Sequence, residues 1–230
     1  IGGVLRDWKF YVRGTDVAAT NPGHRCETAI DLGNQDVNPA IIVGNSLGAW
    51  AAMLYARAHP ERVARIVLVN GGALTGERTD LSLTPATREE AAALMTQLRD
   101  PKAQPIPGYV LDDVVRLART GPLARLAQTA SEMDRYVLDG QLAGIGAPAD
   151  LIWGESDRLF SLAYARRMLV QLQAARLTTI PGCGHVPQQE CPARFASALS
   201  DVLTMPPPLP APKNVQPEPH GPGGAPGSRP

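Results

Sequence analysis

The sequence predicts an α/β fold in which a mostly parallel sheet is flanked by helices. Short β-branched runs recur along the chain, and each is nearly continuous in apolar residues, as expected for strands buried on both faces of a sheet. Helical stretches separate these runs, and this regular exchange of strand and helix is typical of parallel sheets. One long helical region interrupts the alternation and indicates an insertion.

Five strands and three flanking helices are expected. The strand candidates are residues 17–20, 40–43, 66–70, 150–153 and 177–180. The first helix candidate, 47–58, is rich in Ala and Leu, and the second, 161–173, carries apolar residues at helical spacing. The third, 192–203, begins with a proline suited to a first helical turn.

Residues 75–146 contain no convincing strand but four amphipathic helical runs, at 87–99, 109–120, 122–130 and 132–142. About seventy residues are too many for a plain connection, so a sub-domain is expected. Ligands of α/β proteins bind at the carboxyl edge of the sheet, which favours a helical cap, or lid, over the site. The predicted organisation is an α/β core in two parts, 1–74 and 147–204, with the cap at 75–146 and a tail at 205–230.

The tail is rich in proline and glycine, and ten of the 22 prolines lie between Pro206 and Pro230. It has no apolar periodicity and little to bury, so a disordered, solvated appendage is expected. The run Pro-Pro-Pro-Leu-Pro at 206–210 is also a candidate polyproline II ligand for a groove-binding partner.

Composition and charge exclude several classes of protein. The 22 basic and 22 acidic side chains balance, whereas nucleic-acid binding needs surplus Lys and Arg to neutralise phosphates. No apolar run approaches the roughly 20 residues that span a bilayer, and the first residues do not resemble a signal peptide. Cys26, Cys183 and Cys191 cannot all pair and match no metal-ligand spacing. We therefore expect a cytoplasmic protein that binds neither nucleic acid nor membrane and needs no metal or other cofactor.

The sharpest local signal is Gly44-Asn45-Ser46-Leu47-Gly48, a Gly-x-Ser-x-Gly motif between a predicted buried strand and an Ala-rich helix. So sharp a turn needs glycine on both sides of the serine, and it raises the hydroxyl above the sheet. The Leu47 N–H, at the start of the helix, is suited to stabilise a developing oxyanion. The alternative is a serine that merely caps a helix, but the flanking strand and helix favour a nucleophile.

A serine nucleophile needs a base, and the chain has four histidines. His220 lies in the tail, His59 ends the helix after the motif, and His24 lies in a turn before the serine. His185 follows the last predicted strand in a Gly- and Pro-rich loop, at the edge where the serine turn also opens. Elimination and position therefore favour His185 as the general base.

An acid that orients the histidine is expected between Ser46 and His185 in the chain, after another strand. The turn that follows the predicted strand 150–153 supplies two carboxylates, Glu155 and Asp157. Spacing alone leaves both open as the acid, and the other carboxylate is then a solvated loop charge.

From residue 39 to about residue 203 the chain resembles the α/β-hydrolase family, in its serine esterase-like branch. Four segments carry the resemblance, in the family's order: the turn at 44–48, the run 59–70, the acid turn 153–157, and the histidine loop 184–192. The resemblance implies a triad of Ser46 as nucleophile, Asp157 as acid and His185 as base. It also implies that residues 75–146 are the family's cap, and that the cysteines beside His185 are small buried fillers without a redox role.

The N-terminal residues depart from the family pattern. Members usually begin with two or three further strands and a His-Gly motif, whose following N–H completes the oxyanion hole. Residues 2–8 resemble the family's segment immediately after that motif, which makes Gly3, or Gly2, the candidate second donor beside Leu47. The resemblance thus implies an N-terminally truncated or divergent core. Loss of one oxyanion donor costs on the order of 2.7–4 kcal/mol of transition-state stabilisation.

Three functions fit these residues. The first is a serine hydrolase that cleaves a small, hydrophobic carboxylic ester through an acyl-enzyme. The second is hydrolysis of a carbon–carbon bond in a dienoic ring-cleavage product by the same triad. The third is an inactive, truncated relative that serves as an interaction protein, because a missing sheet edge invites a partner strand. The preference for a hydrophobic substrate comes from apolar side chains of the predicted cap: Leu94, Met95, Leu98, Tyr109, Val110, Met133 and Tyr136.

Overall fold

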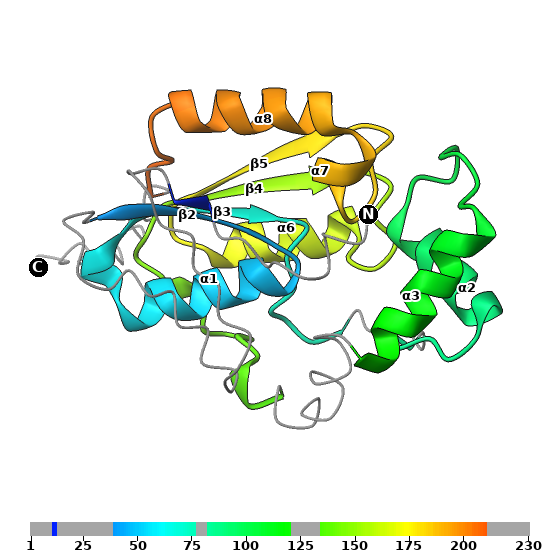
Figure 1. The fold of residues 1–230 in the computed structure, drawn as a ribbon. Coiled ribbons are helices and arrows are strands. Elements are labelled where there is room, and N and C mark those ends of the chain that lie inside the picture. The colour runs from blue at the N-terminus through cyan, green and yellow to red at the C-terminus, as the bar shows by residue number, and fades with distance from the viewer. Residues whose placement is uncertain (1–10, 13–38, 77–81, 121–133, 211–230) are drawn as a thin grey trace, which may run out of the picture.

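The structure is a computed structural model that describes residues 11–12, 39–76, 82–120 and 134–210. Within these residues a five-stranded sheet has the order β1-β2-β3-β4-β5. Strands β2 to β5 run parallel (Figure 1). Strand β1 pairs antiparallel with β2. The strands are β1 (Tyr11–Val12), β2 (Ala40–Asn45), β3 (Val63–Val69), β4 (Ala149–Gly154) and β5 (Ala175–Ile180).

Four of the five strand predictions are confirmed by β2 to β5. The candidate at 17–20 lies outside the described residues, and β1 was not expected. The predicted α/β fold with a mostly parallel sheet is therefore confirmed.

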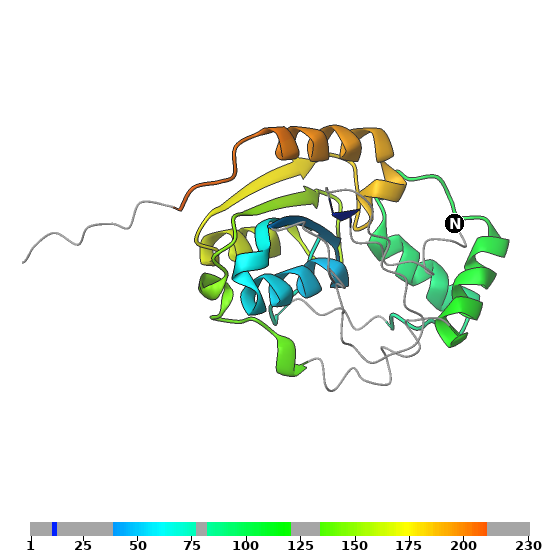
Figure 2. The same cartoon turned by 60° about the vertical axis from the view of Figure 1, so that its left-hand side comes forward.

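Helices cover both faces of the sheet, as the alternating pattern predicts. Helices α1 (Leu47–Ala58) and α6 (Leu162–Gln171) pack on one face, and α8 (Pro192–Thr204) packs on the other (Figure 2). A single 3-10 turn, η1 (Pro60–Arg62), joins α1 to β3, and the short α7 (Pro187–Glu190) precedes α8. The three predicted flanking helices are confirmed.

Strands β2, β3 and β4 are mostly apolar because helices cover both faces of the sheet. Along β3, Ile66 and Leu68 belong to the hydrophobic cluster under α1 and α6. Their neighbours Val67 and Val69 belong to a second cluster under α8. Successive side chains of a strand point to opposite faces, so a strand covered on both sides needs an unbroken apolar run.

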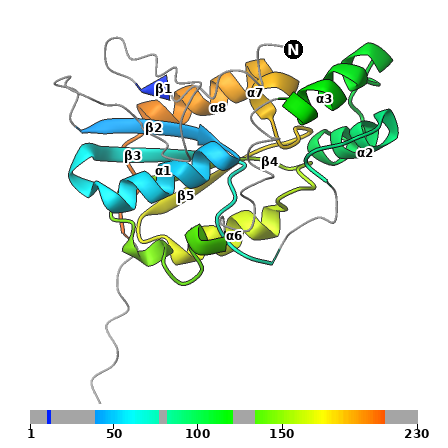
Figure 3. The same ribbon diagram turned by 60° about the horizontal axis from the view of Figure 1, so that its bottom comes forward.

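The described part of the predicted insertion contains two α-helices, α2 (Arg88–Leu98) and α3 (Gly108–Thr120). They pack on one another beyond the carboxyl ends of the parallel strands (Figure 3). The side chain of Thr87 caps α2 by accepting a hydrogen bond from the Glu90 N–H. The helix predictions at 87–99 and 109–120 are confirmed, and the candidate at 122–130 lies outside the described residues. The division of the chain into core and cap stays a prediction.

The helix predicted at 132–142 is wrong over its described part, which holds only the 3-10 turns η2 (Asp134–Tyr136) and η3 (Leu142–Gly144). Between them, the Leu138 N–H donates to the Ala73 carbonyl at 2.7 Å instead of to a helical partner. Gly140 adopts a φ of +68°, which ends regular helix. Leu138 and Leu142 are both buried in the cluster under α1, so their spacing reflects packing of an irregular segment onto the core.

The beginning of the Pro-rich tail is described as far as Pro210 and contacts the core through the Arg65 guanidinium, which donates to the Met205 carbonyl at 3.1 Å. The disorder expected for the rest of the tail concerns residues outside the described part. No helix in the described ranges combines the length and the apolar character that crossing a bilayer requires.

Candidate active site

Ser46 forms the sharp turn between β2 and α1, with φ +54° and ψ −118°. Its N–H donates to the Val69 carbonyl at 2.9 Å, which fixes the turn to the neighbouring strand. A Cβ at Gly44 would lie 2.3 Å from the Gly48 carbonyl oxygen, so the turn excludes any side chain there. Ser46 makes no side-chain cap hydrogen bond to α1, which argues against the helix-capping alternative.

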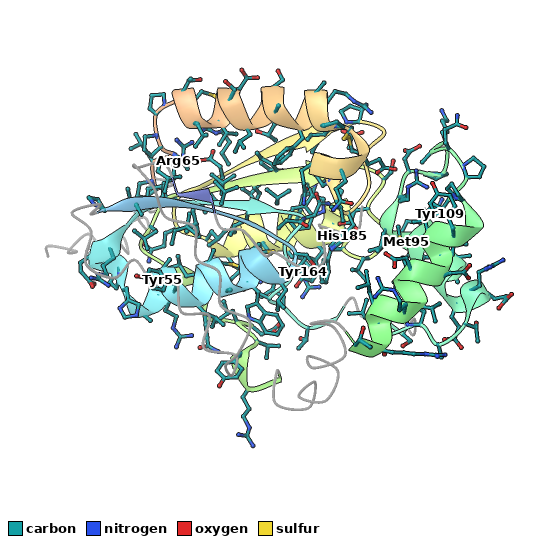
Figure 4. All side chains as sticks on the ribbon, viewed as in Figure 1. Tyr55, Arg65, Met95, Tyr109, Tyr164 and His185 are labelled. Atoms are coloured by element: carbon teal, nitrogen blue, oxygen red, sulfur yellow. A yellow bond between two sulfur atoms is a disulfide. The ribbon has the colours of Figure 1, made fainter. Side chains whose placement is uncertain are left out.

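The structure brings Ser46, His185 and Asp157 together. The Ser46 Oγ lies 2.8 Å from His185 Nε2, and His185 Nδ1 lies 2.8 Å from Asp157 Oδ2. His185 is only 3% exposed and Asp157 only 5% (Figure 4 shows His185 at the carboxyl end of the sheet). The exposed Glu155 instead accepts a hydrogen bond from Thr179 Oγ1 at 2.8 Å, so Asp157 is the carboxylate that contacts the histidine.

The Asp157 carboxylate accepts four hydrogen bonds. The N–H groups of Leu159 and Phe160 reach Oδ1 at 2.8 and 3.0 Å. The Asn70 Nδ2 reaches Oδ2 at 2.7 Å, beside the bond from His185. These donors replace the water that a buried carboxylate loses. Sequence reasoning missed Asn70, and its only signal is a polar residue directly after an apolar strand.

The backbone of His185 is held from three sides. The His185 N–H donates to the Leu98 carbonyl at 2.8 Å, and the His185 carbonyl accepts from Asn45 Nδ2 at 3.0 Å. The preceding Gly184 N–H donates to Glu190 Oε2. A Cβ at Gly184 would lie 2.4 Å from the Leu98 oxygen, so glycine is required for the loop to approach the end of α2.

The residues after α2 are also fastened to the acid turn. The Asp100 N–H donates to Glu190 Oε1 at 2.8 Å, and the Ser156 hydroxyl donates to the Asp100 carboxylate. This hydroxyl and the Lys102 N–H lower the pKa of Asp100 below its ordinary value. Both loops of the site are thereby joined to one end of the inserted helical pair.

Cys183 and Cys191 form a disulfide across the histidine loop, with Cα atoms 6.1 Å apart. Both side chains are buried, as expected, but the expectation of two separate filler residues is wrong. Their spacing matches no familiar framework, and only their positions on either side of His185 hint at a pair. Cys26 lies outside the described residues.

The remaining candidate residues lie at either end of α1 or outside the described residues. Leu47 is the first residue of α1, where a helix leaves its N–H groups without intrahelical partners. The second proposed oxyanion donor, Gly3, lies outside the described residues, as do His24, His220 and Met133. His59 ends α1, and its N–H donates to the Tyr55 carbonyl at 2.8 Å.

The apolar side chains expected to face a substrate differ in exposure. Leu94 and Val110 are buried, and Met95 and Leu98 are half-buried. Tyr109 is 75% exposed and Tyr136 is 54% exposed. The half-buried pair on α2 is therefore the better candidate for a substrate-facing surface.

A comparison with known protein families agrees with the observed fold. The chain belongs to the alpha/beta hydrolase family, whose family model matches residues 8–198. A 2-hydroxy-6-oxononadienedioate/2-hydroxy-6-oxononatrienedioate hydrolase of Paraburkholderia xenovorans is 27% identical over 186 residues. This match covers 73% of the chain but 63% of the relative, so the chain spans somewhat less than two thirds of that protein's length.

Solved structures share the fold. A serine hydrolase from Cycloclasticus zankles superposes with a TM-score of 0.62 at 21% identity, over 74% of this chain and 66% of that one. The 2-hydroxy-6-oxo-6-phenylhexa-2,4-dienoate hydrolase of a Rhodococcus species gives a TM-score of 0.59 at 19% identity, over 72% of this chain and 64% of that one.

Proposed function

We propose that the protein is a serine hydrolase that works through an acyl-enzyme intermediate, with Ser46 as nucleophile, His185 as general base and Asp157 as the orienting acid. The observation that carries the proposal is the continuous pair of 2.8 Å contacts from Ser46 through His185 to Asp157. The nucleophile stands on a strained strand-to-helix turn, which is the arrangement in which an exposed serine is presented to a substrate.

The chemistry follows from these contacts. His185 Nε2 accepts the Ser46 proton as Oγ attacks the substrate carbonyl, and it then protonates the departing group. Asp157 orients the imidazole and stabilises its positive charge. The Leu47 N–H, with the Gly3 N–H as the proposed second donor, stabilises the oxyanion. Water, deprotonated by His185, then attacks the acyl-enzyme and restores the Ser46 hydroxyl.

For the substrate we propose a small carboxylic ester with a hydrophobic acyl part. The support is local: the Leu98 carbonyl bonds the His185 N–H, so the C-terminal end of α2 lies against the histidine loop. The half-buried Leu98 and Met95 belong to this part of α2 and would present apolar surface to an acyl chain.

Hydrolysis of a carbon–carbon bond in a dienoic ring-cleavage product is the second candidate. It is favoured by the name of the Paraburkholderia relative, a hydrolase of 2-hydroxy-6-oxo dienedioates. The two candidates are separated by comparing turnover of a short p-nitrophenyl ester with turnover of a 2-hydroxy-6-oxo dienoate. The substrate with the higher kcat/KM identifies the reaction class.

A fluorophosphonate probe tests the shared mechanism. We expect the folded wild-type chain to be labelled and Ser46→Ala to remain unlabelled, because the probe phosphonylates an activated serine. If circular dichroism shows a folded wild-type sample that takes up no label, the hydrolase proposal fails and the inactive relative with an interaction role is favoured. Binding of a partner by the 206–210 segment and a cytoplasmic location stay predictions.

A further inference from the structure

We propose that Asn70 is a positioning residue for the triad, which holds the Asp157 carboxylate in the orientation that meets His185. This inference rests on the proposed function, because it concerns the acid of that triad. Asn70 directly follows β3 and is completely buried. Asn70 is the last residue of the run 59–70, to which the sequence assigned no site role. Its side chain bonds Asp157, so its effect on the reaction would pass through the acid.

The orientation of the Asn70 amide is determined by its neighbours. Its Oδ1 accepts from the Gly154 N–H at 3.1 Å, and its Nδ2 donates to Asp157 Oδ2 at 2.7 Å. The reversed amide would place oxygen against a carboxylate and nitrogen against an N–H, and both contacts would be repulsive. Asn70 therefore offers a donor, and only a donor, to the acid.

The backbone around Asn70 fixes this donor rigidly. Its N–H donates to the Ile152 carbonyl of β4 at 3.1 Å, and its φ is +43°. Among residues with a side chain, Asn and Asp adopt this left-handed region most readily. Asn70 is thus fixed at the carboxyl end of the sheet. Its backbone bonds β4, and its side chain bonds Asp157 in the turn that follows β4.

The donor acts on the oxygen that matters for orienting the base. Asp157 Oδ1 is held by two backbone N–H groups, whereas Oδ2 receives only Asn70 and His185 among the described contacts. Without Asn70 the carboxylate keeps its Oδ1 bonds but gains freedom to rotate Oδ2 away from His185 Nδ1. The expected consequence is a poorly oriented imidazole and a slower reaction at Ser46.

Two substitutions test this role. Asn70→Ala keeps a Cβ but removes both the donor to Asp157 Oδ2 and the acceptor for the Gly154 N–H. Asn70→Gly tolerates the backbone and removes the side chain entirely. For each we expect the second-order rate of fluorophosphonate labelling to fall on the order of tenfold or more, as for directly coupled neighbours. In the Asp157→Asn background, Asn70→Gly should change the rate by less than about twofold, because there is no carboxylate left to position.

Tyr164→Phe is the matched control. Tyr164 is as buried as Asn70, and its hydroxyl bonds Ala73 and Leu74, which follow Asn70 in the chain, without contacting Asp157. We expect this variant to lose stability but to keep the wild-type labelling rate in the folded state. This result is expected for a buried polar group that stabilises the fold without positioning the triad.

The NMR signal of the His185 Nδ1 proton provides a readout that does not need turnover. We expect the hydrogen-bonded resonance in the wild type and in Tyr164→Phe, and its shift or loss in both Asn70 variants. Wild-type labelling rates and an unchanged resonance in the Asn70 variants would overturn the inference. A wild type that is folded but unlabelled would defeat the proposed function instead, and the resonance would still decide whether Asn70 positions Asp157 and His185.

Discussion

Ser46 combines a left-handed backbone conformation with a side chain that bonds a histidine rather than its own helix. Such conformations cost on the order of 1–3 kcal/mol and persist where surrounding contacts enforce them. Here the enforcing contacts are the Ser46 N–H bond to Val69 and the close approach of Gly44 to Gly48. The local strain is thus consistent with a residue kept for chemistry, as proposed.

The roles of the two carboxylates in the acid turn are separable by substitution. In Asp157→Asn the amide would hold His185 in the wrong tautomer, so we predict a fall in kcat of about 10⁴-fold. Glu155→Gln is the control, because Glu155 is exposed and its carboxylate bonds only Thr179 among the described contacts. Ester hydrolysis or probe labelling at saturating concentration measures both. Equal losses in the two variants would contradict the assignment of the acid.

Tyr164 predicts a dependence of stability on alkaline pH. Burial raises the pKa of its phenol above the ordinary value of about 10. The folded state therefore holds the proton more tightly than the unfolded chain. The resulting stability is fully present below about pH 10 and is lost as pH rises through the raised folded pKa. Urea unfolding between pH 8 and about 11 should show a steeper loss for the wild type than for Tyr164→Phe, and parallel profiles would refute this.

At the scale of elements, the histidine loop and the end of α2 form one unit. Glu190 joins them by accepting hydrogen bonds from the Gly184 and Asp100 N–H groups. The Leu98 carbonyl adds a direct bond to His185. Any displacement of this end of α2 must therefore disturb the loop that carries the base.

Glu190→Ala should loosen this unit, because it leaves two backbone donors without their acceptor. We predict a loss of about 1–3 kcal/mol in the free energy of unfolding, together with slower probe labelling of the folded protein. Glu190→Gln keeps one acceptor oxygen, so its stability and labelling rate should lie between those of Glu190→Ala and the wild type. The exposed Glu61 provides a surface control, for which alanine should change stability by less than about 0.5 kcal/mol. Unaltered labelling in Glu190→Ala would show that the loop does not depend on this bridge.

Elements were predictable where one physical pattern determined them. Strands β2, β3 and β4 are mostly apolar because helices cover both faces of the sheet, and such runs are visible in the sequence. The segment 134–144 shows the limit, since its apolar spacing fits a helix while tertiary contacts of Leu138 and the turn at Gly140 determine its actual path. The disulfide between Cys183 and Cys191 likewise depends on the loop's path, which spacing does not encode.

In the candidate site, too, local sequence patterns were predictable and contacts between distant segments were not. Ser46 and His185, and an acid at Glu155 or Asp157, were predictable because each follows a strand of a parallel sheet, and such ends meet at one edge. The choice of Asp157 over Glu155 depended on the family resemblance. The side chains that hold them were not, because Asn45, Asn70 and Glu190 act through contacts between segments far apart in the chain.

At the scale of the whole molecule, the two ends of the sheet differ in chemistry. The carboxyl end carries the proposed triad, and the amino end carries an ionic cluster in which the buried Asp150 pairs with Arg65 and Arg176 (Figure 4 labels Arg65, far from His185). Arg65 also donates to the Val202 carbonyl at 2.7 Å. The cluster thus joins β3, β4 and β5 to the end of α8.

Asp150→Ala should destabilise the whole fold, because it leaves the buried Arg65 without its counter-ion. We predict a loss of about 3–5 kcal/mol in the free energy of unfolding. Asp113→Ala is the comparison, since it breaks an ion pair with Arg116 whose side chains are exposed, and such pairs are worth about 0–1 kcal/mol. Chemical denaturation measures both. Similar small losses in the two variants would mean that the buried cluster contributes little.

The central claim is that Ser46 is the activated nucleophile of this alpha/beta hydrolase. Mass spectrometry of the intact chain after fluorophosphonate treatment, followed by peptide mapping, tests it most directly. We expect one adduct per folded chain, located on Ser46 and absent from Ser46→Ala. A folded chain that carries no adduct, or carries it on another residue, would show that Ser46 is not the nucleophile.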